Sequence, residues 1–257
     1  MKKLLLILAS VMCLALLAGC GAGKNDESAS QKVLKVGLDP NFPPFEYYQQ
    51  STDTYTGFDV ELMQALANSM GYGKVEFVNT GLKDLVSGLE AGKYDVIASG
   101  LSITPERQKR IDFSDPYLND GFRIAVTPES ESGGSLNDLD GKTVAVKNES
   151  FALDLVKGYG KAGKIIETAS IEEAINKVID GEADCTVISK SAGSFFITNG
   201  YGGKIKFAGA DLANDKVALA VQKGNTKLLE SLNTALADYR KTQTFDQLKK
   251  TYFGDNM

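Results

Sequence analysis

The spacing of hydrophobic residues after residue 32 switches repeatedly between a strand-like and a helix-like pattern. A short apolar run at residues 33–38 is followed by a segment whose apolar side chains recur every three or four positions, as on one face of a helix. That face carries Phe58, Leu62, Ala65, Leu66 and Met70. Alternating strand and helix patterns predict βαβ units and therefore an α/β fold.

One helix-to-strand unit occurs twice. In the first copy an apolar helical stripe ends at Gly92, and Asp95, three residues later, precedes a strand pattern. Gly181 and Asp184 hold the same places in the second copy. Glycine suits the left-handed residue that ends a helix. Helix-to-strand connections favour such residues in general, so chance is one explanation of the match. The other explanation is that the chain forms two α/β lobes of similar topology, and we predict this arrangement.

The N-terminal residues have the pattern of a signal peptide for export. Lys2 and Lys3 precede residues 4–18, which are apolar except for Ser10. This stretch is too short for a transmembrane helix and has the length of a signal-peptide core. The signal peptide could end at an ordinary secretory cleavage site or at a site where a lipid is attached.

Small residues before Cys20 favour lipid attachment, because residues 17–20 resemble a bacterial lipobox. The resemblance implies that residues 1–19 are a lipoprotein signal peptide and that Cys20 receives the lipid. Residues 20–32 are small and polar, which predicts a flexible tether. We therefore expect a lipid-anchored protein on the cell membrane that faces outside the cytoplasm, in an extracellular or periplasmic space.

Composition narrows the function further. The 257 residues include 33 acidic and 28 basic side chains, so the net charge of −5 gives no basis for binding nucleic acid. Histidine is absent, which excludes Ser-His-Asp and Cys-His nucleophiles and imidazole metal sites. We expect neither a metal nor a cofactor. Cys185 has no partner in the mature chain, so no internal disulfide is expected.

The segment 99–107 has the features of an anion site. Pro105 suits the first position of a helix and Thr104 suits the N-cap, so a helix begins where a strand has just ended. Arg107, in the first turn, could pair with a carboxylate. The alternative is a solvated arginine beside the charged residues Glu106, Lys109 and Arg110.

Two further segments follow predicted strands. Residues 39–46 form a proline-rich loop with aromatic and acidic side chains, and residues 147–150 precede another helix. Open α/β sheets bind ligands at the carboxyl ends of their strands. Taken separately, each segment could be an ordinary loop.

Taken together, these segments resemble a known family. Residues 57–62, Gly-Phe-Asp-Val-Glu-Leu, look like the signature of the polar-amino-acid family of solute-binding proteins of ABC importers. Residues 39–46, 102–107, 112–117 and 252–254 resemble that family in the same order. The resemblance spans residues 33–254.

The resemblance implies a type II periplasmic-binding-protein clamshell, in which each lobe is a central sheet flanked by helices. Lobe 1 would comprise residues 33–117 and 218–257, and lobe 2 residues 122–212. Two hinge crossings would lie near residues 118–121 and 213–217. Such a protein binds a small amino acid between its lobes and delivers it to an importer permease, and we expect it to be a monomer.

The resemblance also implies roles for individual residues. Arg107, the backbone N–H of Ser102 and the segment around Ser150 would hold the α-carboxylate of the amino acid. The Gly100 carbonyl and the Ser102 hydroxyl would face its α-ammonium group. Phe42 and Leu82 would form apolar walls of the site. Asp39 and Lys147 would contact the side chain of the ligand.

Two positions depart from the family pattern. Glu149 stands where members commonly have glycine, and Ser189 stands where many place an aspartate for the α-ammonium group. Three explanations remain open: Glu149 replaces the aspartate; Ser102, Ser189 and the Gly100 carbonyl hold the ammonium weakly; or the ligand lacks that group. We favour the first, because both departures lie at the same rim of lobe 2.

Asp39 can only accept hydrogen bonds and Lys147 can only donate them, so a neutral amide matches both. Glutamine is therefore the first choice of ligand, and arginine or lysine ranks second because Glu149 adds negative charge. We expect no enzymatic activity. The alternatives are a cyclohexadienyl dehydratase-like enzyme on this fold, with Glu149 or Asp39 as the general acid, or a ligand-sensing surface lipoprotein.

Overall fold

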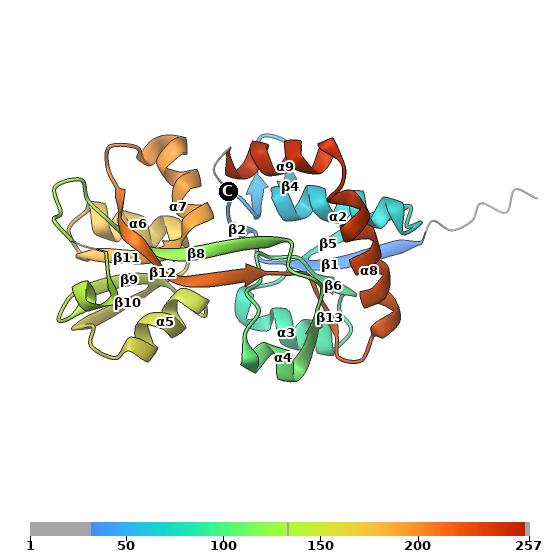
Figure 1. The fold of residues 1–257 in the computed structure, drawn as a ribbon, viewed down its shortest axis with the longest axis horizontal. Helices are drawn as coiled ribbons and strands as arrows, with labels where there is room; N and C mark the ends of the chain where they lie inside the picture. Colours follow the sequence, from blue (N-terminus) through green and yellow to red (C-terminus); the bar gives the residue numbers. More distant parts are fainter. Residues whose placement is uncertain (1–31, 133, 255–257) are drawn as a thin grey trace, which may run out of the picture. The chain divides into compact units, whose positions relative to one another are not determined.

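The computed structural model describes residues 32–132 and 134–254. The expected signal peptide, Cys20 and all of the tether except Lys32 lie outside these residues. Two five-stranded mixed sheets with flanking helices organise the described chain (Figure 1). Within these residues, we find no helix with the length and apolar character needed to span a membrane.

The sheet of lobe 1 has the strand order β5-β1-β6-β13-β7. Strand β1 is parallel to both of its neighbours, β5 and β6, and β13 is antiparallel to both of its neighbours. The strands are β1 (Val33–Leu38), β5 (Lys74–Asn79), β6 (Val96–Ile97), β7 (Ile111–Phe113) and β13 (Ala220–Gln222). The helices are α2 (Phe58–Ser69), α3 (Leu82–Glu90), α4 (Pro105–Arg110), α8 (Thr226–Tyr239) and α9 (Gln243–Phe253).

The sheet of lobe 2 has the order β10-β9-β11-β8-β12, with parallel and antiparallel pairs in the same places. Its strands are β8 (Leu118–Val126), β9 (Thr143–Lys147), β10 (Lys164–Thr168), β11 (Cys185–Ser189) and β12 (Lys206–Val217). Its helices are α5 (Phe151–Tyr159), α6 (Ile171–Ile179) and α7 (Lys190–Phe196), with short helical turns at Leu136–Leu139 and Ile197–Tyr201. The predicted α/β fold with two similarly built sheets is confirmed.

The repeated glycine and aspartate explain part of this likeness. Gly92 and Gly181 both have positive φ angles, 71° and 74°, as expected of residues that end helices. The Asp95 carboxylate accepts a hydrogen bond from the backbone N–H of Lys35 at 2.9 Å. The Asp184 carboxylate accepts one from Thr143 N–H at 2.7 Å. Each aspartate therefore ties the returning chain to the second strand of its own sheet, β1 or β9.

Each sheet has its own hydrophobic core. In lobe 1, Phe58 and Leu62 of α2 are fully buried with Leu34 of β1. In lobe 2, Val156 of α5 packs with Val144 of β9. Separate cores allow each lobe to keep its internal structure if the lobes move relative to each other.

A ladder between β8 and β12 joins the two lobes. The strands lie side by side (Figure 1), and their register runs from Leu118 opposite Val217 to Phe122 opposite Ala213. The expected hinge segments, 118–121 and 213–217, are thus paired with each other. That they act as hinges stays a prediction.

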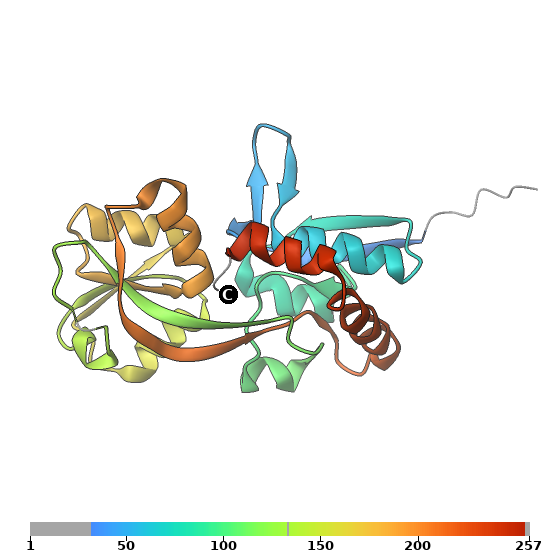
Figure 2. The same cartoon turned by 45° about the horizontal axis from the view of Figure 1, so that its top comes forward.

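A small third sheet lies in the loop that follows β1. It contains β2 (Asn41–Phe42), β3 (Glu46–Gln49) and β4 (Thr54–Thr56), and Figure 2 shows β3 and β4 as a hairpin. The backbone N–H of Asp59 donates to the carbonyl of Phe45 at 2.8 Å. This contact fixes the proline-rich loop against the start of α2.

Candidate functional site

Loops and helix starts from both lobes enclose a cavity at the carboxyl ends of β1, β6, β9 and β11. About 530 Å³ of empty space, part of it open solvent, lies among the side chains that line the cavity. Nine of the ten ligand-binding residues expected from the resemblance line it: Asp39, Phe42, Leu82, Gly100, Ser102, Arg107, Lys147, Ser150 and Ser189. Their roles toward a ligand stay predictions. Glu149 is not among the lining residues.

An ion pair crosses the cavity. Lys147 Nζ of lobe 2 lies 2.7 Å from Asp39 Oδ2 of lobe 1, and both side chains are only 7% exposed. Asn41 Nδ2 donates to the other Asp39 oxygen at 3.0 Å. A buried pair held this way is electrically neutral as a whole, so this part of the cavity presents a strong acceptor beside a strong donor without net charge.

A second carboxyl group, Glu46, lines the cavity behind this pair and has no exposed surface. Ser99 Oγ donates to Glu46 Oε1 at 2.7 Å and accepts from Asp39 N–H at 3.0 Å. Burial, reinforced by the charge of Asp59, raises the pKa of Glu46 well above its usual value. Burial therefore favours the neutral form of Glu46.

Arg107 reaches the cavity from α4, which begins as the sequence predicts. Thr104 is the N-cap, and its hydroxyl accepts from Arg107 N–H at 3.2 Å. The guanidinium donates from Nη1 to the Ser102 carbonyl at 2.9 Å. Within residues 32–132 and 134–254 no carboxylate lies within 4 Å of this half-buried cation. Burial lowers the pKa of Arg107, and the charges of Asp154 and Asp215 partly oppose this effect.

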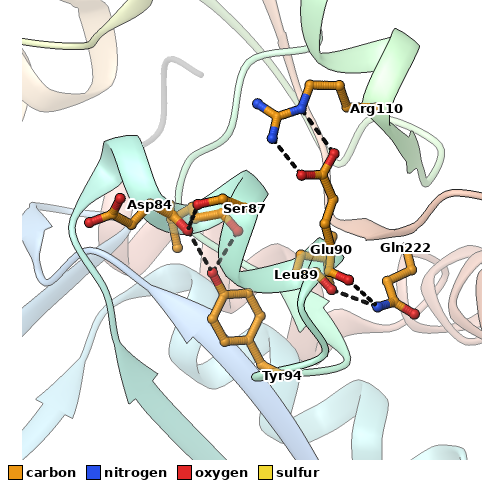
Figure 3. Close-up of polar contacts among 8 residues, drawn as sticks. Asp84, Ser87, Leu89, Glu90, Tyr94, Arg110 and Gln222 are labelled. Carbon is orange, nitrogen blue, oxygen red and sulfur yellow. Dashed lines mark hydrogen bonds and ion pairs between the residues drawn. The ribbon is translucent and has the colours of Figure 1, made fainter.

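Helix α3 accepts hydrogen bonds from Tyr94, Arg110 and Gln222 (Figure 3). Arg110 of α4 forms two hydrogen bonds with the Glu90 carboxylate at the end of α3. Gln222 of β13 donates to the Leu89 and Glu90 carbonyls there, at 2.8 and 3.1 Å. The Tyr94 hydroxyl donates to the Leu85 carbonyl at 2.5 Å. The bonds from Tyr94 and Gln222 hold α3, which starts at Leu82, whereas the pair between Arg110 and Glu90 is exposed.

Gly100 is required by close packing. Its φ angle is +51°, and an added Cβ would lie 2.4 Å from the ring of Phe42. Its N–H donates to Asp59 Oδ2 at 2.7 Å. Phe42 can therefore form a cavity wall only because residue 100 has no side chain.

The Ser150 hydroxyl is already committed within lobe 2. It donates to the Lys147 carbonyl at 2.7 Å and, as the N-cap of α5, accepts from Leu153 N–H at 3.2 Å. Its hydrogen is thus not available to a ligand. The first turn of α5 still has the backbone N–H groups of Phe151 and Ala152, both of which line the cavity.

Ser189 and Ser102 have opposite hydrogen-bonding capacities. Ser189 Oγ accepts from Ala192 N–H at 3.2 Å as the N-cap of α7, which leaves its hydrogen free to donate. Ser102 Oγ donates its hydrogen to Asp215 Oδ2 at 2.8 Å, which leaves it able only to accept. The Ser102 backbone N–H points away from β12, because the flanking bonds to that strand are made by Ile103 N–H and the Leu101 carbonyl.

Glu149 is exposed and has a φ angle of +58°. This left-handed conformation favours glycine, the residue that the family resemblance implies at this position. The hypothesis that Glu149 replaces a missing aspartate in the cavity gains no support from this location.

Most of the lining residues that sequence reasoning missed are apolar. Phe122 and Phe151 pack against each other, with ring centroids 5.2 Å apart. The missed residues are Glu46, Ser99, Leu101, Phe122, Phe151, Ala152, Ile171, Val187 and Ile188. Some adjoin predicted residues, as Phe151 adjoins Ser150 and Ile188 adjoins Ser189, and this adjacency was an available signal. Nothing local in the sequence marks Phe122.

This fold and cavity define a two-lobed α/β solute-binding protein. The sequence pattern of the bacterial extracellular solute-binding proteins, family 3, matches residues 34–255, and the chain belongs to that family.

The chain is 29% identical to the L-cystine-binding protein TcyA of Bacillus subtilis, over all of this chain and 99% of the relative. It is 31% identical to the arginine-binding extracellular protein ArtP of the same organism, over 98% of each chain. An ancestral arginine-binding protein bound to glutamine is a similar solved structure, with a TM-score of 0.80 and 33% identity over 88% of this chain and 99% of that one.

Proposed function

We propose that this protein is an extracytoplasmic receptor that binds a polar amino acid between its lobes and delivers it to an ABC importer. Glutamine is the first choice, and arginine or lysine the second. The observation that carries the proposal is the half-buried Arg107 guanidinium, which lines the cavity without an ion-pair partner among the described residues. A ligand carboxylate supplies the missing anion.

The α-carboxylate has donors on both sides of the cavity. Arg107 and the Ser102 N–H approach from lobe 1, and the backbone N–H groups at the start of α5 approach from lobe 2. A helix N-terminus favours an anion through its free N–H groups and its dipole. One carboxylate held by both lobes stabilises the closed arrangement over an open one.

The ligand side chain meets Asp39 and Lys147. These residues already bond to each other, so an incoming group must insert between them and satisfy both. A primary amide does so, because its N–H₂ donates to Asp39 while its carbonyl accepts from Lys147. The relatives named for arginine and cystine, and the solved structure with glutamine bound, support a polar amino acid and do not single out one.

The receptor is held at the membrane by lipid on Cys20, which the small residues before this cysteine favour. Membrane fractionation tests the anchor: a Cys20→Ala variant should appear in the soluble fraction or as uncleaved precursor. Unchanged membrane association would exclude it.

Calorimetry of the purified protein with L-glutamine, L-arginine and L-glutamate tests the proposed ligand. We expect L-glutamine to bind at least tenfold more tightly than L-glutamate, because a second carboxylate faces Asp39. A tenfold preference for L-glutamate would overturn the charge assignment. Failure of all polar amino acids to bind would overturn the proposed function itself.

A further inference from the structure

Two buried carboxylates face each other on the strands that join the lobes. Asp120 of β8 and Asp215 of β12 are register partners and are 4% and 6% exposed. Neither forms an ion pair with another side chain in the described part of the chain. An unpaired buried carboxylate lowers stability, so its presence beside the cavity calls for a physical explanation.

Asp215 controls a residue that lines the cavity. Ser102 Oγ donates its one hydrogen to Asp215 Oδ2 at 2.8 Å, so its lone pairs can only accept from a ligand. If Asp215 were protonated, it could donate to Ser102 instead and free the serine to donate. The ionisation of Asp215 therefore sets whether Ser102 suits a cation.

Burial raises the pKa of Asp215 to about 6, and the charge of Asp120 adds to this rise. The Ser102 hydrogen bond and the charge of Arg107 act in the opposite direction. Asp215 is thus largely ionised at pH 7. Its charge would be stabilised further by a ligand cation near Ser102.

The cavity otherwise lacks an anion for such a cation. Ser189 stands where the family resemblance implies an aspartate, and Asp39 is paired with Lys147. Burial raises the pKa of Glu46 and so favours its neutral form. We propose that Asp215 is a positioning residue for the ligand α-ammonium group: it fixes Ser102 Oγ as an acceptor and supplies the negative charge that Ser189 does not. The inference rests on the proposed function, because it assumes that the ligand is an amino acid.

The test compares each amino acid with the same molecule lacking its α-ammonium group. The probes are L-glutamine with glutaramate, and L-arginine with 5-guanidinopentanoate. Asp215→Asn keeps the shape of the side chain and an acceptor for Ser102 but removes the charge. We expect this variant to weaken L-glutamine binding tenfold or more while the affinity for glutaramate changes less than threefold, and the arginine pair to respond alike.

Asp120→Asn is the matched control. Asp120 is equally buried and faces Asp215, but its carboxylate accepts from Gly121 N–H and Ser191 N–H and has no hydrogen bond to a cavity residue. We expect Asp120→Asn to leave the ratio of L-glutamine to glutaramate affinity within threefold of the wild type. An equal loss for both probes in Asp215→Asn would indicate a structural role and overturn the inference.

The pH dependence of the wild-type protein provides a measurement that needs no variant. The charged or titratable groups around Asp215 are Asp120 on β8, Arg107 on α4 and Tyr117 before β8. Protonation of Asp215 below pH 6 should weaken L-glutamine relative to glutaramate by about tenfold between pH 7.5 and 5. Asp59 and Glu46 also have raised pKa values, so the same ratio is measured for Asp215→Asn, where we expect it to change less than threefold over this range.

A constant ratio over this range would overturn the inference even if Asp215→Asn did not fold. A wild-type protein that binds neither L-glutamine nor L-arginine would overturn the proposed function for these ligands and this inference together. Binding of the amino acids with an unselective response to Asp215→Asn would overturn this inference alone.

Discussion

The two walls of the cavity differ in how their side chains are used. Lobe 1 contributes five polar or charged residues, and several of these already bond within that lobe: Asp39, Glu46, Ser99, Ser102 and Arg107. Six of the nine residues from lobe 2 are apolar: Phe122, Phe151, Ala152, Ile171, Val187 and Ile188. Lobe 1 is therefore the better prepared for polar recognition, and lobe 2 mainly excludes water.

Fixed polar groups bind a ligand without first losing side-chain freedom. Lobe 1 has this property: Arg107 is held by Ser102, and Asp39 is held by Asn41. The apolar wall of lobe 2 contributes by being removed from water when the lobes approach. The difference suggests that the amino acid binds first to lobe 1 and that lobe 2 then covers it.

Among the substitutions considered, replacement of Arg107 should reduce the affinity for the amino acid most strongly. Arg107→Ala removes the unpaired cation of lobe 1 and leaves the ligand carboxylate without its main partner. Loss of one member of a desolvated charge pair costs about 2–5 kcal/mol, or roughly 30-fold to several-thousand-fold in affinity. Calorimetry with the tightest-binding amino acid measures the loss.

Arg110→Ala is the control, because Arg110 lies on the same short helix but is exposed and paired with Glu90. We expect it to change affinity less than threefold. An equally small loss for Arg107→Ala would place the carboxylate elsewhere and remove the assignment of lobe 1 as the polar wall.

The buried acids of lobe 1 should make the free energy of unfolding depend on pH. Burial raises the pKa of Asp59 from 3.8 to about 7. The folded protein therefore holds this proton more tightly than the unfolded chain does. The resulting stabilisation is complete below pH 4 and is lost as pH rises through 7. One such group changes the free energy of unfolding by up to about 1.4 kcal/mol per pH unit.

Asp59→Asn should remove this part of the pH dependence. Denaturant unfolding measured from pH 5 to 8 should show a shallower decline than in the wild type, with Glu46 still contributing to the slope. Asp184→Asn is a suitable control, because Asp184 is exposed in lobe 2 and makes an equivalent backbone contact. An unchanged slope in Asp59→Asn would mean that this carboxyl does not titrate in the folded protein over that range.

Local features of the sequence predicted much of the fold, and the family resemblance named most of the polar residues that line the cavity. Thr104 is an N-cap, as its position before Pro105 predicts, and Gly92 and Gly181 take the expected left-handed conformation. These outcomes depend on a few neighbouring residues. The link between Ser102 and Asp215 joins positions 113 residues apart, and no local pattern predicts such a contact.

The apolar wall was missed for a related reason. Val187 and Ile188 read as ordinary residues of a buried strand, and only the arrangement of two lobes exposes them to a cavity. Glu149 is a different case, because the sequence marked it as unusual but did not define where its side chain lies. Its difference from glycine was visible in the sequence, but whether its side chain enters the cavity depends on the conformation of residue 149, which the sequence alone does not define.

Substitution of Glu149 should produce the smallest effect. A residue other than glycine in the left-handed region costs roughly 1 kcal/mol, so Glu149→Gly should raise the free energy of unfolding by up to about that amount. Because Glu149 is exposed and does not line the cavity, the affinity for an amino acid should change less than threefold.

Glu149→Ala separates the effect of the carboxylate from the effect of the backbone conformation, since it removes the carboxylate but retains the strained backbone. We expect Glu149→Ala to change neither stability nor affinity by much. If both variants instead weaken the binding of an amino acid more than tenfold while glutaramate binding is unchanged, the Glu149 carboxylate serves the α-ammonium group, and lobe 2 contributes more charge to recognition than its apolar wall implies.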